Sequence, residues 1–166
     1  MKASDASYFT PSPQDVRIAN AKRERPVASV EEITAVLRTL PSSMATEKRD
    51  RAIIAFALLT GARDGAISTS RLEHVDLEAG AVFQDAREVE TKRRKTSTTT
   101  FFPVGAEPLK IFEEYLHFLK TDLDFGPDDP LFPSTLVGQG TARAFCGIAG
   151  DRIRALSSLR KLLTRT

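Results

Sequence analysis

The sequence predicts an α+β fold that is mainly helical and carries a small antiparallel three-stranded sheet. Two observations lead to this prediction. Apolar residues recur at helical spacing on both sides of the middle of the chain. Between His74 and Val104 the pattern changes to short β-prone runs separated by turn residues. The order of helices, a small sheet and further helices is typical of an α+β domain.

The first folded helix is expected to begin at Ser29. Residues 1–28 are polar and interrupted by prolines, and we interpret them as a linker, with the folded domain spanning residues 29–166. Val16–Glu24 could form a short basic helix within this linker. Ser29 and Glu32 make a capping box, and apolar residues follow at helical spacing until Pro41.

A second helix is predicted from about Thr46 to Thr60. Its second half, Ala52–Leu59, is apolar all round, which indicates the central buried helix. Gly61 is expected to end it, because glycine adopts a positive φ at low cost. Arg63–Ser70 is expected to form another short helix or a turn.

Short β-prone runs follow at Val75–Leu77, Ala81–Phe83, Val89–Thr91 and Thr98–Phe102. The polar segment Arg93–Ser97 is the expected tip of a hairpin that joins the last two strands.

After the strands, Pro108 should open another helix. Its apolar stripe consists of Leu109, Phe112, Leu116 and Leu119. Ser134–Gly150 is expected to be a loop, and Asp151–Thr164 has weak helical periodicity.

Composition excludes several classes of protein. Hydrophobic residues make up 41% and charged residues 28% of the 166 positions, as in ordinary globular domains. The longest apolar run, Ala52–Leu59, is too short to cross a bilayer, so no membrane partner is expected. The single cysteine, Cys146, excludes an internal disulfide and fits a reducing cytoplasm.

Charge is unevenly distributed along the chain. The net charge is only +2, but basic residues cluster at Arg17–Arg25, Lys92–Lys95 and Arg152–Arg165, and acidic ones at Glu113–Asp129. Such segregation can leave one positive face suited to phosphate. Solvated surface charge is an equally good explanation of each cluster alone.

The segment Arg49–Ile54, followed by Leu58-Leu59-Thr60-Gly61-Ala62-Arg63, resembles the first half of the catalytic domain of tyrosine recombinases, the phage integrase family. In that family the arginine of T-G-x-R holds the scissile phosphate. This resemblance implies that role for Arg63, and a guanidinium suits it because it donates two parallel hydrogen bonds. A structural ion pair is the alternative role. The family's glutamate three residues later is replaced here by Ala66.

A second match is the hairpin. Val89–Thr96 and the closing strand at Phe101–Gly105 resemble the family hairpin whose lysine protonates the leaving 5′ oxygen. Lys95 is the favoured counterpart of that lysine, and Lys92 is the second choice. The resemblance also implies backbone DNA contacts for Lys92, Arg93, Arg94 and Thr96. The alternative to the acid role is that all four basic residues merely contact the DNA backbone or water.

The remaining family residues do not follow. No H-x-x-R box and no C-terminal tyrosine are found, and the two tyrosines, Tyr8 and Tyr115, precede where that box would lie. Ser157–Lys161 resembles H-S-x-R-K with serine in place of histidine, so Arg160 could replace the second-box arginine. In a second alignment, Arg160–Thr166 is a helix that precedes the box. Without a phenolic nucleophile no covalent phosphotyrosyl intermediate can form.

Three functions remain open. The first is a catalytically incomplete, DNA-binding fragment of an integrase-type recombinase, associated with DNA integration and site-specific recombination. Its partner would be the phosphate backbone of double-stranded DNA in the cytoplasmic nucleoid. The second is a modulator that pairs with an intact recombinase. The third is a small α+β interaction domain unrelated to DNA. Whether the chain is an enzyme is left open, and no cofactor, metal or nucleophile is expected.

Overall fold

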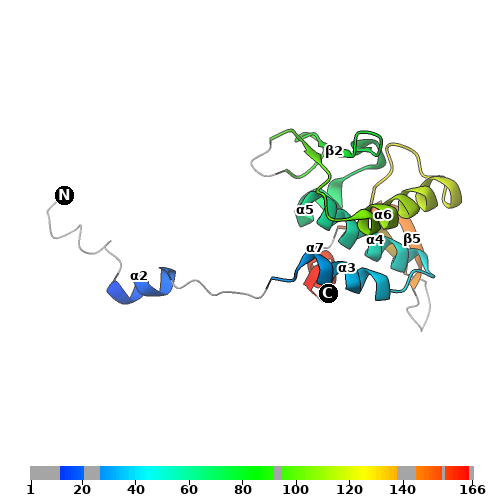
Figure 1. Ribbon diagram of the computed structural model, residues 1–166. Coiled ribbons are helices and arrows are strands. Elements are labelled where there is room, and N and C mark those ends of the chain that lie inside the picture. Colours follow the sequence, from blue (N-terminus) through cyan, green and yellow to red (C-terminus); the bar gives the residue numbers. More distant parts are fainter. Residues whose placement is uncertain (1–11, 21–26, 92–94, 138–144, 155, 165–166) are drawn as a thin grey trace.

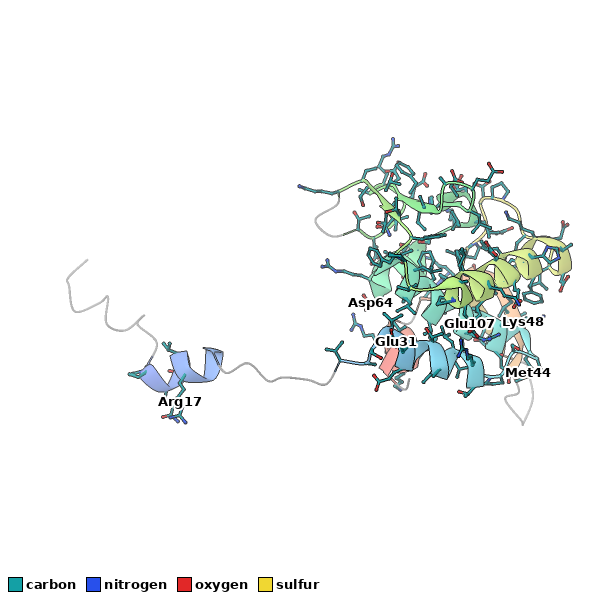
Figure 2. All side chains as sticks on the ribbon, viewed as in Figure 1. Arg17, Glu31, Met44, Lys48, Asp64 and Glu107 are labelled. Carbon is teal, nitrogen blue, oxygen red and sulfur yellow. The ribbon has the colours of Figure 1, made fainter. Side chains whose placement is uncertain are left out.

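The computed structural model describes residues 12–20, 27–91, 95–137, 145–154 and 156–164 (Figure 1). It has the expected α+β fold, with helices packed around a three-stranded antiparallel sheet and a second antiparallel pair of strands. The N-terminal helix α2 (Pro13–Asn20) lies apart from the other elements, and its Arg17 is far from them (Figure 2). None of the helices in the described ranges is both long and apolar enough to span a bilayer.

Helices α3 (Val30–Thr39) and α4 (Ala45–Thr60) form where the sequence predicts them. The Ser29 hydroxyl accepts the amide of Glu32 at 3.1 Å, and the Glu32 carboxylate accepts the amide of Ser29 at 2.8 Å. The predicted capping box is therefore confirmed. A box of this kind stabilises a helix start by about 1 kcal/mol.

Helix α4 is the centre of the core. Its Ala52, Ile53, Ala55 and Phe56 are 0% exposed, as its all-apolar second half predicts. Helix α6 (Ala106–His117) packs against it, two residues longer at its start than Pro108 suggests. Aromatic rings join the two helices to the segment before the second strand pair: the Phe56 ring centroid lies 5.2 Å from Phe112 and 5.3 Å from Phe132. A π-helical turn, η4 (Phe118–Asp122), continues α6.

The three-stranded sheet follows the short helix α5 (Asp64–Thr69) and the single turn η2 (Leu72–His74). Its strands are β1 (Val75–Asp76), β2 (Ala81–Gln84) and β3 (Ser97–Thr100), hydrogen-bonded in that order. In the register, Val82 is opposite both Val75 and Thr99. The sheet is therefore a meander beside the end of α4 (Figure 1).

The prediction of a strand at Val89–Thr91 is wrong. Asp85 begins a turn instead, because its carbonyl accepts the amides of Glu88 at 3.0 Å and Val89 at 2.8 Å. The amide of Glu90 then donates to the Thr69 hydroxyl on α5 at 2.9 Å. The hairpin therefore joins β2 directly to β3, and residues 85–91 pack onto α5.

The prediction of a loop over Ser134–Gly150 is wrong at both described ends of that range, and residues 138–144 lie outside the described residues. Strands β4 (Pro133–Val137) and β5 (Phe145–Arg152) pair antiparallel, with two irregularities in their register. This pairing depends on a distant partner, because the buried Arg49 of α4 donates to the Pro133 carbonyl and the Thr135 hydroxyl at 2.9 Å each. A local apolar pattern cannot reveal such support. Helix α7 (Leu156–Thr164) follows, inside the segment with weak helical periodicity.

Candidate functional site

The Thr60-Gly61-Ala62-Arg63 turn is held by its own hydrogen bonds. Gly61 has φ 62°, the left-handed conformation expected of it, and its amide donates to the Ala57 carbonyl at 2.8 Å. The Thr60 hydroxyl donates to the Phe56 carbonyl at 2.7 Å and accepts the Ala62 amide at 3.1 Å. Arg63 then takes an extended conformation before α5. The backbone that carries Arg63 is therefore fixed at both sides.

Phe102 joins this turn to the end of β3. Its amide donates to the Leu59 carbonyl at 2.7 Å, and its ring lies 3.1 Å from where a Cβ on Gly61 would be. Any other residue at Gly61 would meet the ring and would be strained at a positive φ. The glycine thus has two functions, since it ends α4 and lets the hairpin approach the turn.

Arg63 and Lys95 line one open hollow, which we call the Arg63 hollow. It contains about 820 Å³ of space not filled by atoms. Both side chains are exposed, and they come from separate sequence motifs. The remaining lining residues are Thr60, Gly61, Ala62, Ala66, Gln84, Glu90, Thr91, Ser97 and Thr99.

Neither cation of the Arg63 hollow is neutralised by a contact. Within the described ranges, Arg63 and Lys95 make no ion pair. Some other exposed arginines are paired, as in Arg38–Glu107 at 2.6 Å. The hollow is therefore a polar concavity with two positive charges available to a ligand.

Glu90 is the charged residue of the hollow to which the sequence motifs gave no role. Its carboxylate lies over Gly65, 2.8 Å from where a Cβ on that glycine would be. It lines the same hollow as the buried Ala66, the position at which the resemblance described above would place a glutamate. The sequence signal for this contact is the small pair Gly65-Ala66, which leaves room for a side chain from another segment.

Helix α7 meets the site through a different contact. The Nε of Arg160 lies 2.5 Å from Oδ2 of Asp64, the residue after Arg63. This ion pair and the Gly65 amide hold the pKa of the Asp64 carboxyl below its usual range. Arg160 therefore lies next to the turn but does not line the Arg63 hollow.

The other DNA-contact residues expected from the hairpin divide into two groups. Lys92, Arg93 and Arg94 lie outside the described residues. Thr96 is exposed, and its hydroxyl accepts the amide of Ala86 at 3.1 Å. It does not line the Arg63 hollow.

A His-carboxylate cluster lies apart from the residues that line the hollow. Glu73, His74 and Glu88 bring three potential metal-ligating atoms within 4.8 Å of one another. His74 Nδ1 accepts the Arg71 amide at 2.9 Å, so Nε2 carries the proton and donates to Glu88 at 3.0 Å. Both ring nitrogens are thus used, and the cluster reads as a structural support for η2.

Tyr115 is in the core. It is 2% exposed, its hydroxyl donates to the Leu131 carbonyl at 3.0 Å, and burial raises its pKa far above the usual range. A nucleophile needs an accessible oxygen that ionises readily. Tyr115 has neither property and does not line the Arg63 hollow. Tyr8 lies outside the described residues.

A comparison of the chain with models of protein families finds no match, and a comparison with curated proteins finds none.

Proposed function

We propose that this chain is a DNA-binding domain of the tyrosine recombinase type, which holds a backbone phosphate of duplex DNA between Arg63 and Lys95 without cutting the strand. One observation carries the proposal. Two cations that the family motifs single out, on the turn after α4 and on the hairpin, line one hollow and make no ion pair within the described residues.

The chemistry of the hollow suits a phosphate. The Arg63 guanidinium can donate two parallel hydrogen bonds to phosphate oxygens. Lys95, on the hairpin, adds a second positive charge. With Glu90 included, the three charged residues that line the hollow sum to +1. A single phosphodiester carries one negative charge, so it would neutralise the hollow. Such contacts are independent of base sequence and weaken as salt rises.

Strand cleavage is not part of the proposal. In this chain Tyr8 and Tyr115 are the two tyrosines, and Tyr115 is buried with its hydroxyl engaged. A recombinase needs a tyrosine oxygen that attacks phosphorus and stays bonded to the 3′ phosphate. Arg63 and Lys95 therefore act here as binding residues, in a protein that is catalytically incomplete.

The two alternatives have less support. Arg63 and Lys95 lying far apart, or buried in unrelated ion pairs, would favour an interaction domain unrelated to DNA, whereas both residues line one hollow. A modulator of an intact recombinase would need a docking face for its partner. The exposed large apolar side chains of the described residues are spread over several elements, so they do not identify such a face.

The proposal is tested by titrating a labelled duplex with the protein at low and at moderate salt. We expect binding at low salt that falls steeply as salt rises. Arg63→Ala and Lys95→Ala should each weaken it about five- to tenfold and should each lower the salt slope by about one. Arg154→Ala, which removes an exposed cation that does not line the Arg63 hollow, serves as the control and should cost less than about twofold.

A duplex that fails to bind at low salt would reject the proposal. Equal losses in Arg63→Ala and Arg154→Ala would also reject it, because binding would then depend on total charge and not on the hollow.

A further inference from the structure

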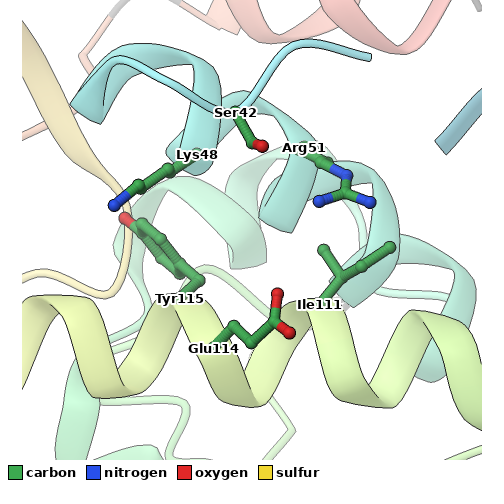
Figure 3. A pocket seen from close by; sticks show the side chains of 6 residues that line it. All are labelled: Ser42, Lys48, Arg51, Ile111, Glu114 and Tyr115. Carbon is green, nitrogen blue, oxygen red and sulfur yellow. The ribbon is translucent and has the colours of Figure 1, made fainter. Parts of the chain in front are cut away.

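A second hollow lies between α4 and α6, and we call it the Lys48 hollow (Figure 3). We propose that it binds a small organic carboxylate, independently of any DNA. Its cavity volume is about 150 Å³, enough for a ligand of only a few heavy atoms. It is lined by Ser42, Lys48, Arg51, Ile111, Glu114 and Tyr115.

Arg51 is the expected anchor for the carboxylate. Its Nε donates to the Leu37 carbonyl at 2.8 Å, which fixes the guanidinium relative to α3. Its two terminal nitrogens have no ion-pair partner among the described residues. A guanidinium fixed in this way loses little conformational entropy when it binds a ligand, so more of the energy of its contacts contributes to affinity.

The groups around Arg51 complete a polar pocket. The Ser42 hydroxyl and the Arg51 guanidinium face the same space (Figure 3), so both can donate to one carboxylate. Lys48 adds a positive charge at the opposite side, where its Nζ lies 4.2 Å from the centre of the Phe118 ring. The Tyr115 hydroxyl already donates to the Leu131 carbonyl, so its oxygen can accept a hydrogen bond but has no proton left to donate.

Glu114 limits the charge of the ligand. Its carboxylate points toward the same space (Figure 3), and the charged residues that line the hollow, Lys48, Arg51 and Glu114, sum to +1. Glu114 also lies 3.9 Å from Lys110 Nζ, but both side chains are exposed, so solvent screens that pair. A monoanion neutralises this pocket, whereas a phosphate dianion would leave an excess negative charge beside Glu114. The observations therefore favour a monocarboxylate over a phosphate.

The pocket also has room for an apolar chain. A neighbouring groove shares Arg51, Ile111 and Glu114 but is also lined by Glu107 and Lys110, so it is largely charged. The apolar surface for a short chain lies inside the Lys48 hollow, on Ile111 and the ring of Tyr115. A short alkyl tail on the carboxylate would bury there, and each buried methylene contributes about 0.8 kcal/mol at most, or about fourfold in affinity.

The test is a titration of the full chain, followed by backbone amide NMR shifts at constant ionic strength, with acetate, butyrate and inorganic phosphate as probes. We expect saturable shifts around Ser42, Arg51 and Ile111, butyrate binding more tightly than acetate, and phosphate binding no more tightly than acetate. Arg51→Lys keeps the positive charge but loses the planar guanidinium that can donate two parallel hydrogen bonds, and it should weaken butyrate binding about fivefold. Arg154→Lys is the matched control and should change nothing.

Two further variants keep the proposal testable if Arg51→Lys does not fold. Ser42→Ala should weaken butyrate about threefold, and Glu114→Gln should strengthen it about threefold. Shifts that do not saturate, or that spread over the basic surface and respond equally to Arg154→Lys, would mean an adventitious ion only and would overturn the proposal. Tighter binding of phosphate than of butyrate would overturn it too.

Discussion

Two arginines flank the buried part of α4 and differ in their surroundings. Arg49 is 6% exposed, pairs with Asp50 at 2.7 Å, and donates to the Pro133 carbonyl and the Thr135 hydroxyl. Arg63 follows the other end of the helix, is exposed, and makes no ion pair within the described residues. The two arginines lie at opposite ends of one helix, yet the hydrogen-bonding groups of Arg49 are satisfied by the protein and Arg63 has no ion-pair partner among the described residues.

This difference shows how a structural arginine can be distinguished from a binding one. A buried guanidinium must have its donors satisfied within the fold, since the loss of each partner leaves a costly unpaired group. An exposed guanidinium fixed by a rigid turn costs the fold little and remains available to an anion. We therefore expect changes at Arg49 to affect stability and changes at Arg63 to affect binding.

The largest effect is expected for Arg49→Ala. It removes the hydrogen bonds that hold β4 on α4 and leaves Pro133 and Thr135 without their partner. The free energy of unfolding should fall by about 3 kcal/mol, measured by urea denaturation followed by circular dichroism. A change below about 0.5 kcal/mol would show that Arg49 is not the support described here.

Gly61→Ala should have the next largest effect. Alanine at φ 62° is strained, and its Cβ would lie 3.1 Å from the Phe102 ring. The expected loss is about 1–2 kcal/mol of unfolding free energy. Because the substitution also shifts the turn before Arg63, DNA affinity should fall under conditions where the variant is fully folded. Full stability with normal DNA affinity would contradict the role of Gly61.

Glu90→Gln should strengthen DNA binding. It removes the negative charge that lines the Arg63 hollow, while the neutral amide keeps nearly the same shape. We expect affinity for duplex DNA to rise about threefold at low salt, with a melting temperature unchanged within error. Glu113→Gln, an exposed acid on α6, is the matched control. Weaker DNA binding by Glu90→Gln would mean that the carboxylate positions a cation in the hollow.

The smallest effect concerns Asp85 at the start of the hairpin turn. The Arg87 guanidinium holds the pKa of its carboxyl at about 2, below the usual 3.8. A lowered folded-state pKa adds stability that is present above about pH 4 and is lost as pH falls toward 2. The difference in unfolding free energy between wild type and Asp85→Asn should therefore be constant from pH 5 to 7 and shrink below pH 4. A difference independent of pH over that range would argue against the ion pair.

Local signals predicted much of the fold. The capping box at Ser29, the all-apolar half of α4 and the glycine at position 61 each act within one or two helical turns, and all three predictions are confirmed. The strand at Val89–Thr91 was wrong because Asp85 begins a turn that a β-prone pattern cannot show. Strands β4 and β5 were missed for a related reason, since their support comes from Arg49, far away in the sequence.

The candidate site was predictable only in part. The T-G-x-R and hairpin resemblance singled out Arg63 and Lys95, and the fold places both in one hollow. Glu90 and the contact between Arg160 and Asp64 were not predicted, because each joins segments with no shared pattern. The role of the hollow itself remains a proposal.

The central claim is that Arg63 and Lys95 hold the same phosphate, and a double-mutant cycle in DNA binding tests it most directly. Titration of one duplex with wild type, Arg63→Ala, Lys95→Ala and the double variant at low salt gives the coupling between the two residues. If they share a phosphate, the double variant should lose clearly less affinity than the product of the two single losses. Losses that multiply would place the residues on separate phosphates, and unchanged affinity in both single variants would contradict the account.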